Sequence, residues 1–163
     1  MHLRFMTPFP WHSFEIRTRL TSQQVREALA AHLEEEKWFR IGWPNQKNDK
    51  RFAGRVMDGG FEIHRILGYR NSFAPVSTGT ISSDGRGARI EVKMRLHPLV
   101  IGFIVVWLAI MLSLFTGAAF DASPLFAAIP ILALLFIYTM TLFAFWFEAS
   151  KQEQTLREIF QAA

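Results

Sequence analysis

The clearest pattern in the chain is an alternation of apolar and polar positions. In "FEIRTRL" (14–20), the apolar residues and Thr occupy every second position, with charged residues between them. This period of two predicts a strand with one buried face. The alternation is strongest in "ARIEVKMRLH" (88–97), and shorter runs lie at 51–57, 61–70 and 76–82. The turn sequences "DGG" and "SDGRG" separate adjacent runs, which is typical of hairpins.

One segment between these runs changes to a helical period. In "TSQQVREALAAHLEEE", Thr21 and Gln24 have the spacing of a capping box. The residues Val25, Ala28, Leu29, His32 and Leu33 fall on one apolar stripe. We expect this helix to continue through residues 34–36 as its solvated end. The pattern predicts an α+β fold, with an antiparallel meander of about five or six strands packed by this helix and by a C-terminal helix.

Two long segments contain no charged residue. They cover residues 98–120 and 122–147, and only Asp121 interrupts them. A helix needs roughly 20 apolar residues to cross a bilayer. We therefore expect a two-helix transmembrane hairpin with helices at about 98–116 and 125–147, and Pro98 suits the first turn of a helix.

The hairpin divides the chain into three parts. Residues 1–97 form the expected cytoplasmic α+β domain, and residues 98–147 form the hairpin. Residues 148–163 continue as a helix whose apolar stripe comprises Leu156, Ile159, Phe160 and Ala163. We expect this last helix to pack on the sheet, so that the hairpin is inserted before the final helix of the domain.

The distribution of charge predicts the orientation. Residues 1–97 contain 16 Lys or Arg and 10 Asp or Glu, whereas the loop between the apolar segments contains only Asp121. The positive-inside rule then places both termini in the cytoplasm. A basic domain beside anionic lipid accounts for the net charge of +4 without a nucleic-acid partner.

The sequence lacks the motifs of several classes of enzyme and metal site. There is no cysteine, so disulfides and thiolate metal sites are excluded. No nucleophile elbow, phosphate-binding loop or dinucleotide fingerprint occurs, and the five histidines have no metal-ligand spacing. We expect no enzymatic activity, no metal and no cofactor.

The first candidate site contains the basic residues that precede the first apolar helix. Arg89, Lys93, Arg95 and His97 alternate on the polar face of residues 88–97, where they could contact anionic lipid headgroups. The plainer interpretation is that they only set the membrane topology.

The second candidate site is "YRNSFAP" (69–75). Tyr69, Arg70, Asn71 and Phe73 could contact a ligand or partner in a pocket between the sheet and its helices. In the alternative, Asn71 satisfies turn backbone groups and Phe73 secures the loop by packing.

Two of these stretches, "YRNSF" (69–73) and "MRLHP" (94–98), followed by two apolar helices, resemble a family of small uncharacterised bacterial inner-membrane proteins. The resemblance covers roughly residues 52–115 and implies a multi-pass protein of the inner membrane, with no activity to transfer. We therefore expect a membrane-anchored module that binds protein partners, anionic lipid headgroups or a second copy of the chain. The alternative is a ligand-binding or sensory domain with a pocket near Tyr69, Arg70 and Asn71.

Overall fold

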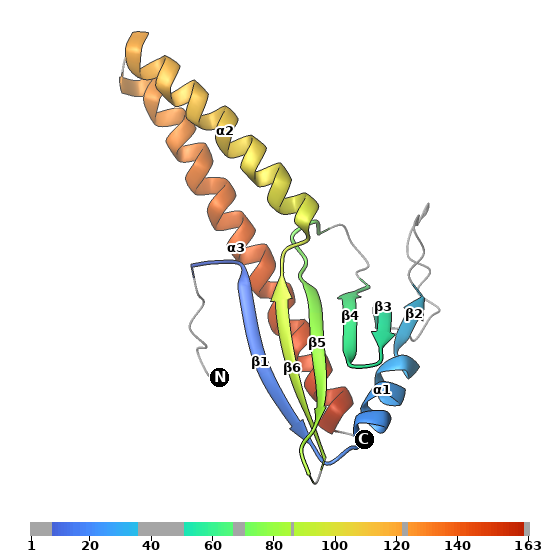
Figure 1. The fold of residues 1–163 in the computed structure, drawn as a ribbon. Coiled ribbons are helices and arrows are strands. Elements are labelled where there is room, and N and C mark those ends of the chain that lie inside the picture. The colour runs from blue at the N-terminus through green and yellow to red at the C-terminus, as the bar shows by residue number, and fades with distance from the viewer. Residues whose placement is uncertain (1–7, 36–50, 67–70, 86, 122–123, 162–163) are drawn as a thin grey trace.

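The computed structural model describes residues 8–35, 51–66, 71–85, 87–121 and 124–161 (Figure 1). The strands are β1 (Trp11–Thr18), β2 (Leu33–Glu35), β3 (Phe52–Met57), β4 (Gly60–Arg65), β5 (Val76–Ser83) and β6 (Ala88–Arg95). The helices are α1 (Ser22–Ala31), α2 (Pro98–Asp121) and α3 (Pro124–Gln161). The first part of the long helix α3 pairs with α2 in the hairpin, and its last part lies beside the sheet (Figure 1). The predicted α+β fold, with the apolar hairpin before the last helix, is confirmed.

The strands form one six-stranded sheet in the order β1-β6-β5-β4-β3-β2. Strands β3 to β6 are an antiparallel meander, and β1 pairs antiparallel with β6. The register sets Phe14 opposite Val92 and Ile16 opposite Ile90. Because side chains alternate along a strand, this register brings the apolar positions of both strands to the same face. The first strand of the chain thus completes the face that the meander begins.

Helices α1 and α3 cover that apolar face. Val25 and Leu29 of α1 are fully buried, as are Leu156 and Phe160 of α3. These residues belong to a single hydrophobic cluster with the inward side chains of the strands. The other sheet face, which we call the open face, carries no helix in the described part of the chain (Figure 1).

The helix α1 is shorter than its sequence predicts. The capping box of Thr21 and Gln24 is present, but the helix ends at Ala31 and Leu33–Glu35 forms β2. The prediction of a solvated helix end at residues 34–36 is therefore wrong for residues 34 and 35, and residue 36 lies outside the described residues. Strand β2 pairs parallel with β3, and the N–H of Phe52 donates to the carbonyl of His32 at 3.2 Å. Hydrogen bonding at a sheet edge, which the local sequence does not encode, overrides the helical propensity.

Two helices are long and apolar enough to cross a membrane. The most apolar 18-residue stretch within Pro98–Thr116 has a mean hydropathy of 2.7, and the one within Ala128–Gln161 has a mean hydropathy of 2.2. Helix α2 begins at Pro98, as predicted. Helix α3 contributes to the hairpin with its first part, and its second part lies against the sheet (Figure 1). A single continuous helix therefore joins the apolar hairpin to the core of the sheet domain.

Candidate functional site

Strand β6 leads almost directly into α2. Its alternation places Lys93 and Arg95 on the open face, while Leu96 is buried and His97 is exposed. We call Lys93, Arg95 and His97 the basic junction. By the rise of a strand, Arg95 lies about 10 Å from the first residue of α2 and Lys93 about 16 Å. The basic junction is thus the part of the open face nearest to the apolar hairpin.

His97 has a second role at the start of α2. Its Nδ1 accepts a hydrogen bond from the N–H of Leu99 at 3.2 Å. Its carbonyl accepts one from the N–H of Val100 at 2.9 Å. The residue between, Pro98, has no N–H to satisfy. The imidazole therefore caps the helix through a neutral nitrogen, a role that the sequence did not reveal.

Lys93 and Arg95, the two residues of the basic junction that lie on β6, have no acidic residue directly opposite them. Lys93 lies between Ser13 and Thr78 in the register of the sheet. The neighbours of Arg95 are Trp11 and Val76. Among the described residues, neither Lys93 nor Arg95 forms an ion pair with a carboxylate, in contrast to Arg89.

Arg89 lies at the other end of β6. Its guanidinium contacts Glu15 at 3.4 Å and Asp84 at 3.6 Å. Glu15 also accepts a hydrogen bond of 2.6 Å from Arg17, which holds the pKa of Glu15 below its ordinary value. Arg89 precedes Pro98 by nine residues, which is about 30 Å along a strand. Arg89 thus belongs to a charge-balanced group far from the hairpin.

Exposed aromatic side chains lie at the same end of the molecule as the basic junction. Trp11 is 52% exposed and Phe9 is 70% exposed. The hydroxyl of Tyr138 donates to the carbonyl of Pro8 at 2.6 Å. Tyr138 lies within the apolar part of α3, so this contact places the start of the described chain beside the hairpin. Aromatic residues of this kind are enriched at membrane interfaces.

The second candidate site of the sequence is described only in part, because Tyr69 and Arg70 lie outside the described residues. The side-chain oxygen of Asn71 accepts from the N–H of Phe73 at 3.0 Å, and its carbonyl accepts from Ala74 at 3.2 Å. The ring of Phe73 packs partly buried against the core. Asn71 and Phe73 thus hold a turn in place.

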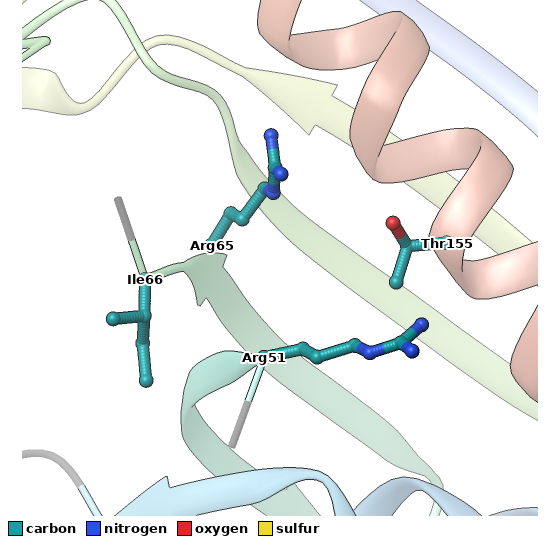
Figure 2. Close-up of a pocket in the computed structure, with 4 residues that line it drawn as sticks. All are labelled: Arg51, Arg65, Ile66 and Thr155. Atoms are coloured by element: carbon teal, nitrogen blue, oxygen red, sulfur yellow. The ribbon is translucent and has the colours of Figure 1, made fainter. Parts of the chain in front are cut away.

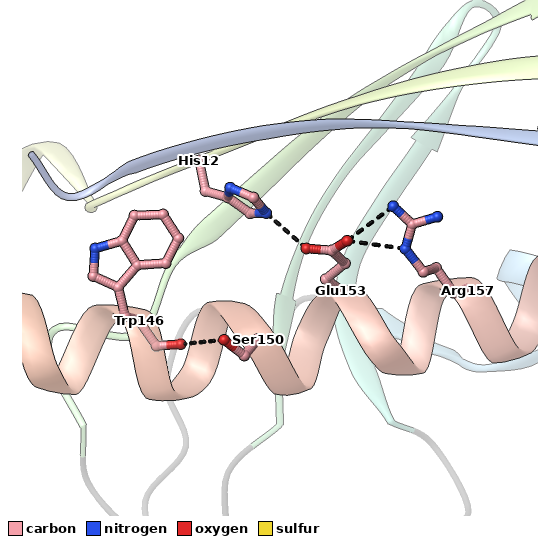
Figure 3. A network of polar contacts seen from close by, with 5 residues as sticks. All are labelled: His12, Trp146, Ser150, Glu153 and Arg157. Carbon is pink, nitrogen blue, oxygen red and sulfur yellow. Dashed lines mark hydrogen bonds and ion pairs between the residues drawn. The ribbon is translucent and has the colours of Figure 1, made fainter. Parts of the chain in front are cut away.

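A group of polar side chains lies between α3 and the sheet. We call His12, Arg65, Glu148, Gln152 and Glu153 the buried polar layer. The fully buried Glu148 accepts from Arg65 at 3.0 Å. Glu153 lies 2.7 Å from the Nε2 of His12 (Figure 3).

The contacts around Glu153 connect β1 to α3. Arg157 also donates to Glu153, at 2.9 Å, and the ring of His12 lies edge-on to Trp146 at 5.1 Å between centroids (Figure 3). The apolar stripe of residues 148–163 predicts that this helix packs on the sheet but does not predict its buried polar contacts. The only indication of these contacts in the local sequence is that acidic residues, beginning at Glu148, directly follow the apolar segment.

A cavity opens beside this layer. It has a volume of about 290 Å³ and is lined by Arg51, Arg65, Ile66 and Thr155 (Figure 2). Both arginine side chains extend toward α3, where Thr155 faces them (Figure 2). Neither Asn71 nor Phe73 is among these lining residues. Tyr69 and Arg70 lie outside the described residues, so the comparison of the cavity with the site that the sequence suggested extends only to Asn71 and Phe73.

The described residues contain no group of three His, Asp or Glu that could hold a metal ion. The chain matches no protein-family model, no curated protein and no solved structure. The function must therefore be inferred from the geometry described above.

Proposed function

We propose that this chain is a membrane-anchored module of non-enzymatic type at the bacterial inner membrane. In this proposal the hairpin spans the bilayer, both termini are cytoplasmic, and the basic junction contacts anionic lipid headgroups. The observation that carries it is the direct passage from β6 into α2, which leaves the unbalanced charges of Lys93 and Arg95 next to the hairpin. Arg89 is excluded from the proposed contact because Glu15 and Asp84 already surround it.

The expected strength follows from the number of charges. Each Lys or Arg near an anionic membrane surface contributes about 1 kcal/mol, so Lys93 and Arg95 together contribute about 2 kcal/mol. The attraction decays over about 8 Å at physiological ionic strength, so Arg95 contributes more than Lys93. His97 contributes as the cap of α2 rather than as a full charge, because its Nδ1 accepts a hydrogen bond.

The exposed aromatic residues support the same orientation. Trp11 is the first residue of β1, and its position opposite Arg95 puts an amphipathic ring beside a positive charge at the hairpin end. The hydrogen bond from Tyr138 to Pro8 holds Pro8 against the hairpin. Such aromatic side chains favour the headgroup level of a bilayer.

The lipid contact can be tested with the full chain in bilayers that contain spin-labelled phosphatidylglycerol or phosphatidylcholine. The measured quantity is the ratio of the two association constants. We expect the double variant Lys93→Gln, Arg95→Gln to lower the preference for phosphatidylglycerol by about fivefold to thirtyfold, in line with the loss of about 2 kcal/mol or less. Raising the salt concentration should lower the preference of the unmodified chain as well.

The matched control is Arg17→Gln, Arg89→Gln, which removes two charges from the same open face at its other end. This variant should keep the preference for phosphatidylglycerol. An equal loss in both double variants would mean that only net charge matters, and an unchanged preference in the variant of Lys93 and Arg95 would refute the headgroup contact.

The orientation has a separate test. Reporter domains fused after residue 120 and after residue 161 should lie on opposite sides of the membrane, with the second one cytoplasmic. A cytoplasmic reporter at residue 120 is incompatible with the hairpin. Purification in mild detergent tests the remaining part of the proposal, namely a protein partner or a second copy. A monomer with neither a partner nor a lipid preference would refute the interaction role.

A further inference from the structure

We infer that the cavity lined by Arg51, Arg65 and Thr155 is a binding site for a phosphate group. Its volume of about 290 Å³ is at the lower end of the range for small-molecule sites, which is about 300–1,000 Å³. The site lies between the sheet and α3 (Figure 2), away from the basic junction. It is independent of the proposed lipid contact.

The backbone fixes both arginines at the mouth of the cavity. The N–H of Arg51 donates to the carbonyl of His32 at 3.1 Å, and its carbonyl accepts from the N–H of Ile66 at 3.1 Å. Arg65 ends β4 directly opposite Phe52 of β3. Two neighbouring strand ends thus present their guanidinium groups from fixed backbone positions. This preorganisation suits an anion, because less freedom is lost on binding.

Each guanidinium keeps donors for a ligand. A guanidinium has five N–H donors, and Arg65 uses one of its nitrogens to bond Glu148 at 3.0 Å. Arg51 lies 3.6 Å from Glu158, and both side chains are more than half exposed. A surface pair of this kind is worth only about 0–1 kcal/mol, so a phosphate can displace Glu158. Arginine forks match phosphate oxygens in geometry as well as in charge.

An unpartnered amide lies on the same stripe of α3 as Thr155, although Gln152 itself is not among the residues that line the cavity. Gln152 is fully buried, and neither its nitrogen nor its oxygen has a hydrogen-bond partner among the described residues. Glu148, Gln152 and Thr155 follow one another on a single stripe of α3, by spacings of four and three residues. The orphan amide therefore lies between the carboxylate that holds Arg65 and the hydroxyl that lines the cavity. A buried amide without a partner is costly and indicates a missing water or ligand.

A phosphate group at this site has two possible sources, a soluble compound and a lipid headgroup. Thr155 follows Phe147, the last residue of the apolar segment, by eight residues, which is about 12 Å along a helix. Lys93 and Arg95, which we propose to contact headgroups, lie at comparable distances from the hairpin, so distance does not separate the two sources. The two arms of the experiment distinguish them.

The experiment titrates inorganic phosphate into the full chain in an uncharged detergent, at constant ionic strength set with chloride, and follows the heat of binding. Arg51→Gln should weaken phosphate binding by about tenfold or more, because it removes a charge-assisted contact. Arg55→Gln is the matched control: Arg55 is also exposed and paired with a glutamate, Glu62, but lies outside the cavity. It should leave the affinity unchanged.

Three results would overturn the inference. They are equal affinities for the chain and its Arg51→Gln variant, an equal loss in the Arg55→Gln variant, and the absence of phosphate binding above the chloride background together with a preference for phosphatidylglycerol that Arg51→Gln leaves unchanged. A second arm measures the preference for phosphatidylglycerol in bilayers. If Arg51→Gln lowers that preference while phosphate fails to bind, the ligand is a headgroup and the soluble source is wrong. The proposed headgroup contact of Lys93 and Arg95 can fail without changing the result of the phosphate titration, because that titration tests Arg51.

Discussion

The ion pair of Arg65 and Glu148 joins the long helix to the sheet, and Arg65→Ala should be strongly destabilising. The carboxylate of Glu148 is 0% exposed, whereas the side chain of Arg65 is 31% exposed. Breaking a buried pair by removing one partner costs about 3–5 kcal/mol, because the buried carboxylate loses the positive charge that it faces. Water already reaches Arg65, so we expect a value near the lower end, about 3 kcal/mol.

Replacing both residues should have a much smaller effect. In Arg65→Leu, Glu148→Leu no charge remains to be buried, and apolar replacement of such a pair is often neutral or stabilising. We expect this double variant to lie within about 1 kcal/mol of the unmodified chain. Recovery of this kind would show that the pair specifies how α3 meets the sheet without adding much net stability.

The assay is urea unfolding of the full chain in detergent micelles, followed by tryptophan fluorescence and evaluated by linear extrapolation. The matched control is Arg55→Ala, which breaks a pair with Glu62 of the same length, 3.0 Å, but with side chains that are 67% and 38% exposed. We expect a cost of about 0–1 kcal/mol there. Equal costs for the two arginines would refute the reasoning from burial.

Two further changes test the core and the distal charge group. Leu156→Ala empties a fully buried position and should lower the free energy of unfolding by about 2–5 kcal/mol in the same urea assay; a cost below about 1 kcal/mol would contradict the packing of α3 on the sheet. Glu15→Gln should lower the melting temperature slightly at neutral pH, because Arg17 depresses the pKa of Glu15 in the folded chain. A carboxylate whose pKa is depressed on folding stabilises the folded state at pH values above its ordinary pKa of about 4.3. This stabilisation is lost as the pH falls from there through the depressed pKa of the folded state. The difference from the unmodified chain should therefore shrink on acidification, and a constant or growing difference would disprove the attribution to Arg17.

The parts of the fold that were predicted correctly are those with a periodic signal. The alternation in residues 88–97 gave β6 and its buried face, and the charge-free segments gave the two hairpin helices. Pro98 marked the start of α2. Strand alternation and the start of a helix depend on local backbone geometry, and a membrane span depends on the summed hydropathy of consecutive residues. Both can therefore be judged from one segment of the sequence alone.

The parts that were missed depend on pairing between distant segments. Strand β2 exists because Leu33 and its neighbours find a partner in β3, although the local composition favours helix. The capping role of His97 depends on its ring turning back toward the N–H of Leu99. Arg89 looks equivalent to Arg95 in the alternating pattern, and only the neighbouring strands distinguish them.

The sequence by itself determined the class of molecule: a sheet domain joined to an apolar hairpin, with basic residues at the joint. Only the tertiary structure decided which polar residues are buried and with whom. His12 and Glu153 are 141 residues apart, and Arg65 and Glu148 are 83 apart. The physical reason is that hydrophobic periodicity is a property of one contiguous segment. The partner of a buried charge, in contrast, belongs to whichever distant segment the fold brings against it. The cavity beside Arg51 has the same origin, because its walls meet only when β3, β4 and α3 are in place.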